Sequence, residues 1–178
     1  LLGDYPTSEP QLQLRLPTER YYEEEGRAEL TPRDFGILMH RVFENAATTD
    51  EIYMAIEAMT QAGVLDEKEA PRLRELVEKA LADPVTAEWF GGRWQVVRNE
   101  NEIILPGSGT TRRPDRVMTD GERAVVVDYK FGDRETARHR KQIREYLRLL
   151  RQMGYTRTEG YLWYVRLGRT ERVEEKED

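Results

Sequence analysis

Apolar residues recur at helical spacing through residues 31–90, and this pattern predicts a run of helices. The first predicted helix begins at Thr31-Pro32, because a threonine N-cap followed by proline is a strong helix start. Its apolar stripe consists of Phe35, Leu38, Met39, Val42 and Phe43. Further helices are predicted from Thr49-Asp50 to Met59, from Asp66 to about Ala82, and from Val85 to Phe90. We expect them to pack against the first helix.

From Trp94 onward the spacing changes to that of strands. Strands are predicted at 94–97, 102–105, 112–118 and 123–129. Asp120-Gly121 is a good hairpin signal between the last two. An amphipathic helix over 136–153 leads to a final apolar strand at 160–165, which should run parallel to the 123–129 strand because a helical crossover joins them. The pattern therefore predicts an α/β domain, with helices followed by a β-β-β-α-β core over 93–168.

The domain is predicted to cover 31–178, with its helical part at 31–90. Residues 1–30 are predicted to be an N-terminal extension, a linker from a preceding domain. The chain starts without a basic region followed by an apolar core, so no signal peptide is predicted, and without Met, which suggests a fragment of a longer polypeptide.

Composition narrows the class of protein. Of 178 residues, 38% are hydrophobic and 35% charged, and no apolar run approaches the roughly 20 residues of a membrane span, so no membrane association is expected. The chain has no cysteine, which excludes disulfides and thiolate zinc sites. The absence of cysteine fits a reducing compartment, and a cytoplasmic location is expected.

Charge is unevenly distributed along the chain. The formal net charge is -6, but residues 134–151 hold seven basic residues against two acidic ones, a local net charge of +5. One interpretation of this basic stripe is a solvated helix face, and the other is a surface for nucleic acid. Before any neighbouring motif is considered, both interpretations stay open.

The strongest chemical signal is Asp128-Tyr129-Lys130, which ends the apolar run Ala124–Val127. A strand places Asp128 and Lys130 on the same face, where two buried ions need a charged partner. Asp115 lies on the preceding strand, and the hairpin could bring it near Asp128. Since two carboxylates repel unless a cation lies between them, a hard divalent cation held by both acids and a backbone carbonyl is an attractive interpretation. Lys130 would then face water or a phosphate rather than pair with Asp128.

Two further features bear on the site. Gly36 and His40 lie on the margin of the first helix's stripe, and a glycine there costs about 0.8–1.0 kcal/mol relative to alanine. Close approach of a backbone or ligand beside His40 would explain the glycine, whereas a boundary histidine without chemistry is the alternative. The segment Gly107–Thr111 superficially resembles a phosphate-binding loop but lacks the Gly-Lys-Ser/Thr ending. We interpret it as a hairpin turn and predict no ATP site.

Together these residues resemble the PD-(D/E)XK nuclease motif, seen in Pro114-Asp115 and Asp128-Tyr129-Lys130. The resemblance is closer to the RecB/AddA-type nuclease domains of UvrD-like helicases, whose elements occur here in order as Gly36-x-x-x-His40, Glu100, Asp115, Asp128-x-Lys130 and Gln142-x-x-x-Tyr146. It covers about residues 31–166. One departure is Arg113-Pro114, where the family usually has a small residue two positions before the first acid. Arg113 could narrow the cleft or contact a phosphate.

The resemblance implies a restriction-endonuclease-like fold, a mixed β-sheet flanked by helices, with an N-terminal helical segment. It implies a Mg²⁺ or Mn²⁺ ion held by His40, Asp115, Asp128 and the Tyr129 backbone carbonyl, with Lys130 catalytic. Gln142 and Tyr146 match a helix motif beside the active site. Glu100 matches the acidic position before Asp115, although Glu102 is close enough to be confused with it. The stripe is then favoured as a DNA contact, through Arg138, Lys141, Arg144 and Arg148.

The function implied is a metal-dependent DNA nuclease, an exonuclease domain joined to a helicase motor in DNA recombination and repair. The alternative from another class is an inactive nuclease-like module that binds DNA or docks a helicase subunit. A third hypothesis is an unrelated α/β domain in which Asp128 and Lys130 form a structural ion pair.

Overall fold

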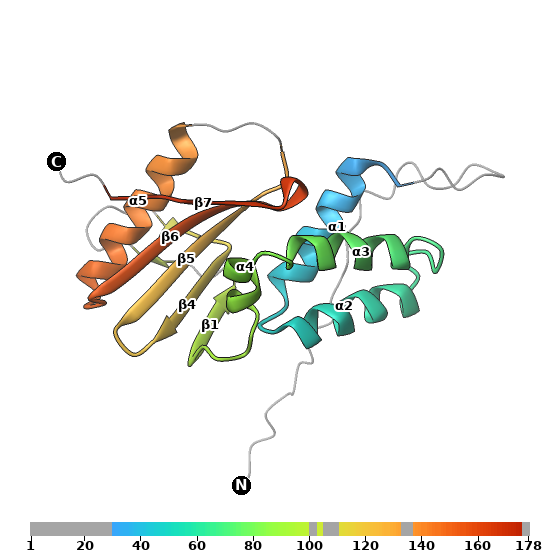
Figure 1. Cartoon of the computed structure of the whole chain (residues 1–178), viewed down its shortest axis with the longest axis horizontal. Helices are drawn as coiled ribbons and strands as arrows, with labels where there is room; N and C mark the ends of the chain where they lie inside the picture. The colour runs from blue at the N-terminus through green and yellow to red at the C-terminus, as the bar shows by residue number, and fades with distance from the viewer. Residues whose placement is uncertain (1–29, 100–102, 105–110, 133–136, 176–178) are drawn as a thin grey trace, which may run out of the picture.

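The computed structural model describes residues 30–99, 103–104, 111–132 and 137–175 (Figure 1). Its centre is a five-stranded sheet with the strand order β1-β4-β5-β6-β7. The long helix α5 lies on one side of this sheet and the helices α1 to α3 lie on the other (Figure 1). The predicted fold class, a mixed sheet flanked by helices, is therefore confirmed.

The helical part comprises α1 (Pro32–Glu44), α2 (Thr49–Gln61), α3 (Ala70–Ala80) and α4 (Pro84–Trp89). The start of α1 is a capping box, in which the backbone N–H of Asp34 donates to the Thr31 hydroxyl and that of Thr31 donates to the Asp34 carboxylate. The predicted start of the third helix at Asp66 is wrong. Asp66 instead closes a turn by accepting from the N–H of Lys68, and α3 begins four residues later.

The main sheet consists of β1 (Val96–Asn99), β4 (Arg116–Asp120), β5 (Arg123–Lys130), β6 (Arg157–Tyr164) and β7 (Arg169–Arg172). Neighbouring strands are antiparallel except β5 and β6, which are parallel across α5 (Ala137–Gln152), as the crossover rule predicted. A short 3-10 helix, η1 (Val165–Leu167), precedes β7.

Two strand predictions need correction. The predicted strand 112–118 is divided between β3 (Thr111–Arg112), which pairs with β2 (Ile103–Ile104) in a separate sheet, and β4. The edge strand β7 was not predicted, because its sequence Arg-Thr-Glu-Arg carries no apolar period. The predicted turn at Gly107-Ser108-Gly109 and the extension 1–29 lie outside the described residues.

The alternation of side chains along β5 divides the interior into two cores. Val125, Val127 and Tyr129 pack with the helical part, whereas Ala124 and Val126 pack with α5. Because side chains alternate across a strand, Asp128 and Lys130 belong to the α5 side of the sheet. Among the described residues, no helix is long and apolar enough to cross a membrane.

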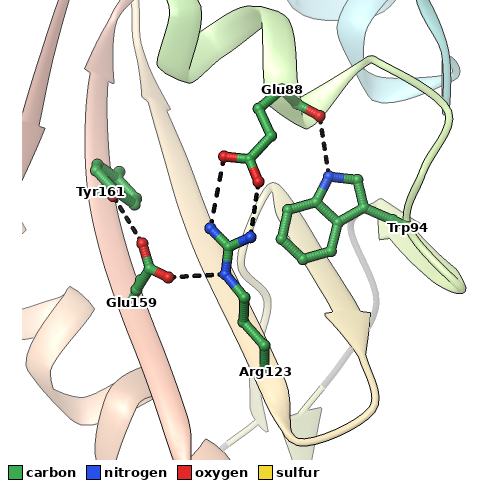
Figure 2. Close-up of polar contacts among 5 residues, drawn as sticks. All are labelled: Glu88, Trp94, Arg123, Glu159 and Tyr161. Carbon is green, nitrogen blue, oxygen red and sulfur yellow. Dashed lines mark hydrogen bonds and ion pairs between the residues drawn. The ribbon is translucent and has the colours of Figure 1, made fainter.

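An ion-pair network ties the helical part to the sheet at the far end of β5 from Asp128 (Figure 2). Arg123 on β5 contacts Glu88 of α4 at 2.7 Å and Glu159 of β6 at 2.8 Å. Trp94 donates through its indole N–H to the Glu88 carbonyl, and Tyr161 donates to the Glu159 carboxylate. The hydrogen bonds to Glu88 and Glu159 raise the pKa of Arg123 above its ordinary value.

Gly160 sets how closely α5 approaches β6. A Cβ at this position would lie 2.4 Å from Ile143 Cγ2 and 3.2 Å from the Leu147 methyl groups. We expect Gly160→Ala to lower the free energy of unfolding by about 1–3 kcal/mol, since an extra methyl in this core must displace the helix. Urea denaturation measures the loss. Gly36→Ala is the matched control, because its Cβ would meet Phe131 only at an ordinary 3.5 Å. Equal stability of the two variants would contradict the close approach.

Candidate active site

Asp115 and Asp128 meet at the carboxyl end of β5. In the β4–β5 pairing, Arg116 lies opposite Val127, so that Asp115, one residue before β4, lies opposite Asp128. The Asp115 carboxylate also accepts a hydrogen bond from the backbone N–H of Tyr129. The hairpin therefore brings together the two acids that the sequence placed on successive strands.

The environment of Asp128 disfavours its negative charge. The residue is only 4% exposed, and this burial raises the pKa of its carboxyl, as does the neighbouring carboxylate of Asp115. Lys130 opposes both effects. The Asp128 Oδ2 atom is buried and accepts no hydrogen bond of good geometry from the described residues, although the Lys130 ammonium forms an ion pair with it.

Lys130 takes a different partner from the one expected. It was expected to face water or a phosphate, whereas here its ammonium is paired with Asp128, two residues earlier on the same face of β5. The reason is electrostatic, because Lys130 supplies the positive charge that two adjacent carboxylates require. Its side chain keeps 20% of its surface exposed, so it can still be reached from solvent.

His40 approaches the acid pair from α1. Its Nε2 atom lies 3.8 Å from Asp115 Oδ1, and its Nδ1 atom lies 3.5 Å from Glu44 Oε2. The imidazole also packs against the ring of Tyr129, on the helical side of the sheet, and against the ring of Phe131. His40 therefore lies near Asp115. The glycine at position 36 is explained as well, because the Phe131 side chain packs closely over it.

The donor atoms around Asp115 and Asp128 are of the kinds that bind a hard metal ion. In the described parts of the chain, no three His, Cys, Asp or Glu side chains are placed together so that they could hold one. Asp115 borders both His40, whose Nε2 atom lies 3.8 Å from its Oδ1 atom, and Asp128, to which its carboxylate is coupled. Two adjacent carboxylates and a backbone carbonyl match the hard oxygen ligands that Mg²⁺ and Mn²⁺ prefer. The complete ligand set stays a prediction.

Gln142 and Tyr146 form a pair on α5. The Gln142 amide donates to the Tyr146 hydroxyl over 3.0 Å, and Tyr146 is fully buried in the core between α5 and the sheet. Both residues lie on α5, the helix that covers the face of β5 to which Asp128 belongs. Glu100 and Glu102 lie outside the described residues.

His139 is a neighbour of the site that the sequence did not single out. Its Nδ1 atom is buried and makes no hydrogen bond within the described residues. Burial lowers the pKa of His139, and the positive charge of Lys130 lowers it further. The sequence pattern of the helix gives His139 no separate role, and only the crossover that brings the start of α5 back to the end of β5 could have revealed its position.

The basic stripe of α5 is partly neutralised within the chain. Arg140 forms an ion pair with Glu171, Arg151 forms one with Glu175, and Arg144 donates to the Glu174 carbonyl. Of the four residues predicted to contact DNA, Arg138, Lys141 and Arg148 are exposed and Arg144 is half-buried. Arg113, at the position where the nuclease motif usually has a small residue, is exposed as well. Exposed positive charge therefore remains near the start of α5, at Arg138 and Lys141, and farther along it at Arg148.

Comparison with known proteins places this chain in a family. No curated protein matches the sequence. The model of the PD-(D/E)XK nuclease superfamily matches residues 11–178, nearly the whole chain, and its match includes the β4–β5 hairpin and α5. The chain belongs to the PD-(D/E)XK nuclease superfamily.

Proposed function

We propose that this chain is a divalent-metal-dependent deoxyribonuclease, and that it is the exonuclease module of a RecB/AddA-type helicase-nuclease in DNA recombination and repair. The observation that carries the proposal is the meeting of Asp115, Asp128 and Lys130 at one end of β5. Members of the superfamily are typically nucleases that use divalent metal ions such as Mg²⁺. The helicase motor is inferred from the ordered motif, which includes His40 and the Gln142–Tyr146 pair.

The carboxylates of Asp115 and Asp128 would hold the metal ion, together with His40 and the Tyr129 carbonyl. A bound Mg²⁺ or Mn²⁺ supplies a Lewis acid for the phosphate and lowers the pKa of bound water. Asp115 also holds the end of β5 in place through the Tyr129 N–H, which fixes the spacing of the two acids. Lys130 places an ammonium where negative charge develops on the scissile phosphate once that phosphate, rather than Asp128, is its partner.

The remaining residues orient the substrate. Gln142 keeps the Tyr146 hydroxyl in position through their 3.0 Å hydrogen bond, on the helix that covers the Asp128 face of β5. Arg138 and Lys141 are exposed near the start of the same helix and can contact backbone phosphates. Arg144 and Arg148 extend this surface along α5. Glu100 is proposed as an additional acid of the site.

The experiment is incubation of the protein with linear and circular, single- and double-stranded DNA, in Mg²⁺, in Mn²⁺ and in chelator. We expect degradation that requires a divalent ion and, for an exonuclease, a free end. Lys130→Met is the control for contaminating nucleases, and it should reduce the rate by about 100-fold or more. Activity that survives chelator or this substitution would contradict the proposal. If no DNA is cleaved and calorimetry detects no metal binding, an inactive docking module would be favoured. In such a module the Lys130–Asp128 ion pair would neutralise Asp128 without a metal ion.

A further inference from the structure

A pocket of about 570 Å³ opens beside the candidate active site, between α1 and the residues that follow β5. Its walls include Gly36, Ile37, His40 and Arg41 of α1, with Phe131 on the opposite side. His40 lines the pocket and also lies beside the acid pair, because its Nε2 atom is 3.8 Å from Asp115 Oδ1. A ligand in this pocket would therefore lie next to the acid pair.

The inner surface of the pocket suits a flat ring. Phe131 follows Lys130 directly and is half-buried, and its ring centroid lies 5.5 Å from that of His40. Gly36 has no side chain, so Phe131 packs closely over α1 there, and the part of its ring that stays exposed borders the pocket. Ile37 adds apolar surface and is 45% exposed. Aromatic and apolar walls of this kind bind nucleobases by stacking.

The rim of the pocket is positively charged. Arg33, Arg41 and Arg166 line it, against one acid, Glu44. The Nη1 atom of Arg41 is buried and donates no hydrogen bond to any of the described residues. The cost of this unmade hydrogen bond would be relieved if the Arg41 guanidinium turned toward an anion in the pocket that it lines.

We propose that this pocket binds one unpaired nucleotide of single-stranded DNA next to the scissile phosphate, with the base stacked on Phe131 and a backbone phosphate at Arg41. This inference rests on the proposed nuclease function and specifies its substrate. A base inside a duplex is stacked on both faces, so it cannot lie against Phe131 until it leaves the helix. The pocket therefore selects single-stranded ends.

Binding is measured by fluorescence anisotropy in chelator, which separates it from cleavage. The probes are a labelled single-stranded 12-mer, its blunt duplex, and the same strand with abasic sites in place of its bases. We expect the wild-type protein to bind the single strand at least about 10-fold more tightly than either of the other probes, because stacking on one aromatic ring gives an effect of that order.

Four variants test the assignment. Phe131→Leu should weaken binding of the single strand by about 10-fold, and Phe131→Trp should preserve it, because both rings stack. Arg41→Gln should weaken binding of all probes and reduce the salt dependence by about one phosphate contact. Ile37→Glu places a carboxylate at an exposed position in the pocket and should weaken single-strand binding without an effect on folding. Arg157→Gln is the matched control, exposed at the opposite end of the β5–β6 pair from Lys130.

The outcomes separate the pocket from the proposed function. Equal affinity for the three probes, or unchanged affinity of Phe131→Leu and Ile37→Glu, would overturn the pocket assignment even if the protein cleaves DNA. Binding that depends on the base and on Phe131 supports the pocket, and it does so even if no cleavage is found, in which case only the nuclease proposal fails.

Discussion

Asp128→Asn is expected to abolish DNA cleavage and, at the same time, to make the metal-free protein more stable. The asparagine keeps the shape of the side chain but removes the charge that burial and Asp115 disfavour. We expect the unfolding free energy at neutral pH to rise by about 1–4 kcal/mol, the range for two unit charges about 4 Å apart between bulk water and the surroundings near a protein surface. Loss of a carboxylate that we propose to bind the metal ion should lower the cleavage rate by about 10³-fold or more.

The contribution of Asp128 to stability changes with pH in a direction that its raised pKa determines. The folded-state pKa of Asp128 is raised above its ordinary value of 3.8. Between these two pKa values the folded state holds a proton that the unfolded state has released, so the contribution of Asp128 to stability falls as pH rises through this window. Above the folded-state pKa, the carboxylate is ionised in both states and its full destabilising effect remains.

Urea denaturation in chelator, for wild type and Asp128→Asn from neutral pH downward, measures this contribution as a difference. The difference in unfolding free energy between the two proteins should become smaller as pH falls. The other acidic residues titrate alike in both proteins, so they do not contribute to this difference. Added Mg²⁺ should raise the stability of the wild type and leave the variant nearly unchanged. A variant that is less stable than the wild type at neutral pH would show instead that the Lys130–Asp128 ion pair is structural.

Arg116→Met is expected to lower the free energy of unfolding by about 3 kcal/mol or more. Arg116 is fully buried, and its guanidinium donates to the carbonyls of Ala46, Ala47 and Trp89, each over 2.7 Å. It also lies over the Phe90 ring, with its Cζ atom 4.0 Å from the ring centroid. Methionine fills a similar volume but removes the Arg116 donors from three carbonyls near the ends of α1 and α4; the Ala46 carbonyl keeps a hydrogen bond from the Asn99 amide, whereas those of Ala47 and Trp89 lose their side-chain donor.

Urea denaturation also measures this loss, with Arg157→Met as the control for replacement of an exposed arginine. The control should stay within about 0.5 kcal/mol of the wild type. The unfolding free energy of Arg116→Lys should lie between those of Arg116→Met and the control, because an ammonium cannot reproduce the planar guanidinium that reaches several carbonyls. Stability of Arg116→Met within about 1 kcal/mol of the wild type would show that relief of the buried charge offsets the lost hydrogen bonds.

The sequence predicted those parts of the site that follow from local pattern. The period of two in β5 placed Asp128 and Lys130 on one face, and the Asp120-Gly121 turn placed Asp115 opposite Asp128. The capping signal at Thr31 correctly located α1, which carries His40. These predictions depend on a few adjacent residues, and turn chemistry and strand alternation are properties of such short segments.

Other features depend on contacts between distant segments. The pairing of Lys130 with Asp128 reflects a local balance of charge that the spacing of the residues leaves open. The place of His139 near Lys130, and the neutralisation of Arg140 by Glu171, follow from the crossover of α5 and from the unpredicted strand β7. The buried role of Arg116 was also absent from the prediction, because nothing in a basic residue's neighbours reveals three carbonyls that lie 27 to 70 residues away.

The parallel pairing of β5 with β6 has a consequence for the order of folding. Its partners, from Arg123 with Arg157 to Lys130 with Tyr164, are 34 residues apart, so the pair can close only after the intervening chain has folded back as α5. Non-local contacts of this kind form slowly, because the entropy of loop closure is lost before they contribute. Lys130 is the last residue of β5 in this pairing. The local β4–β5 hairpin can bring the two acids together before this step, whereas the step itself fixes the end of β5 against β6 and places α5 beside it.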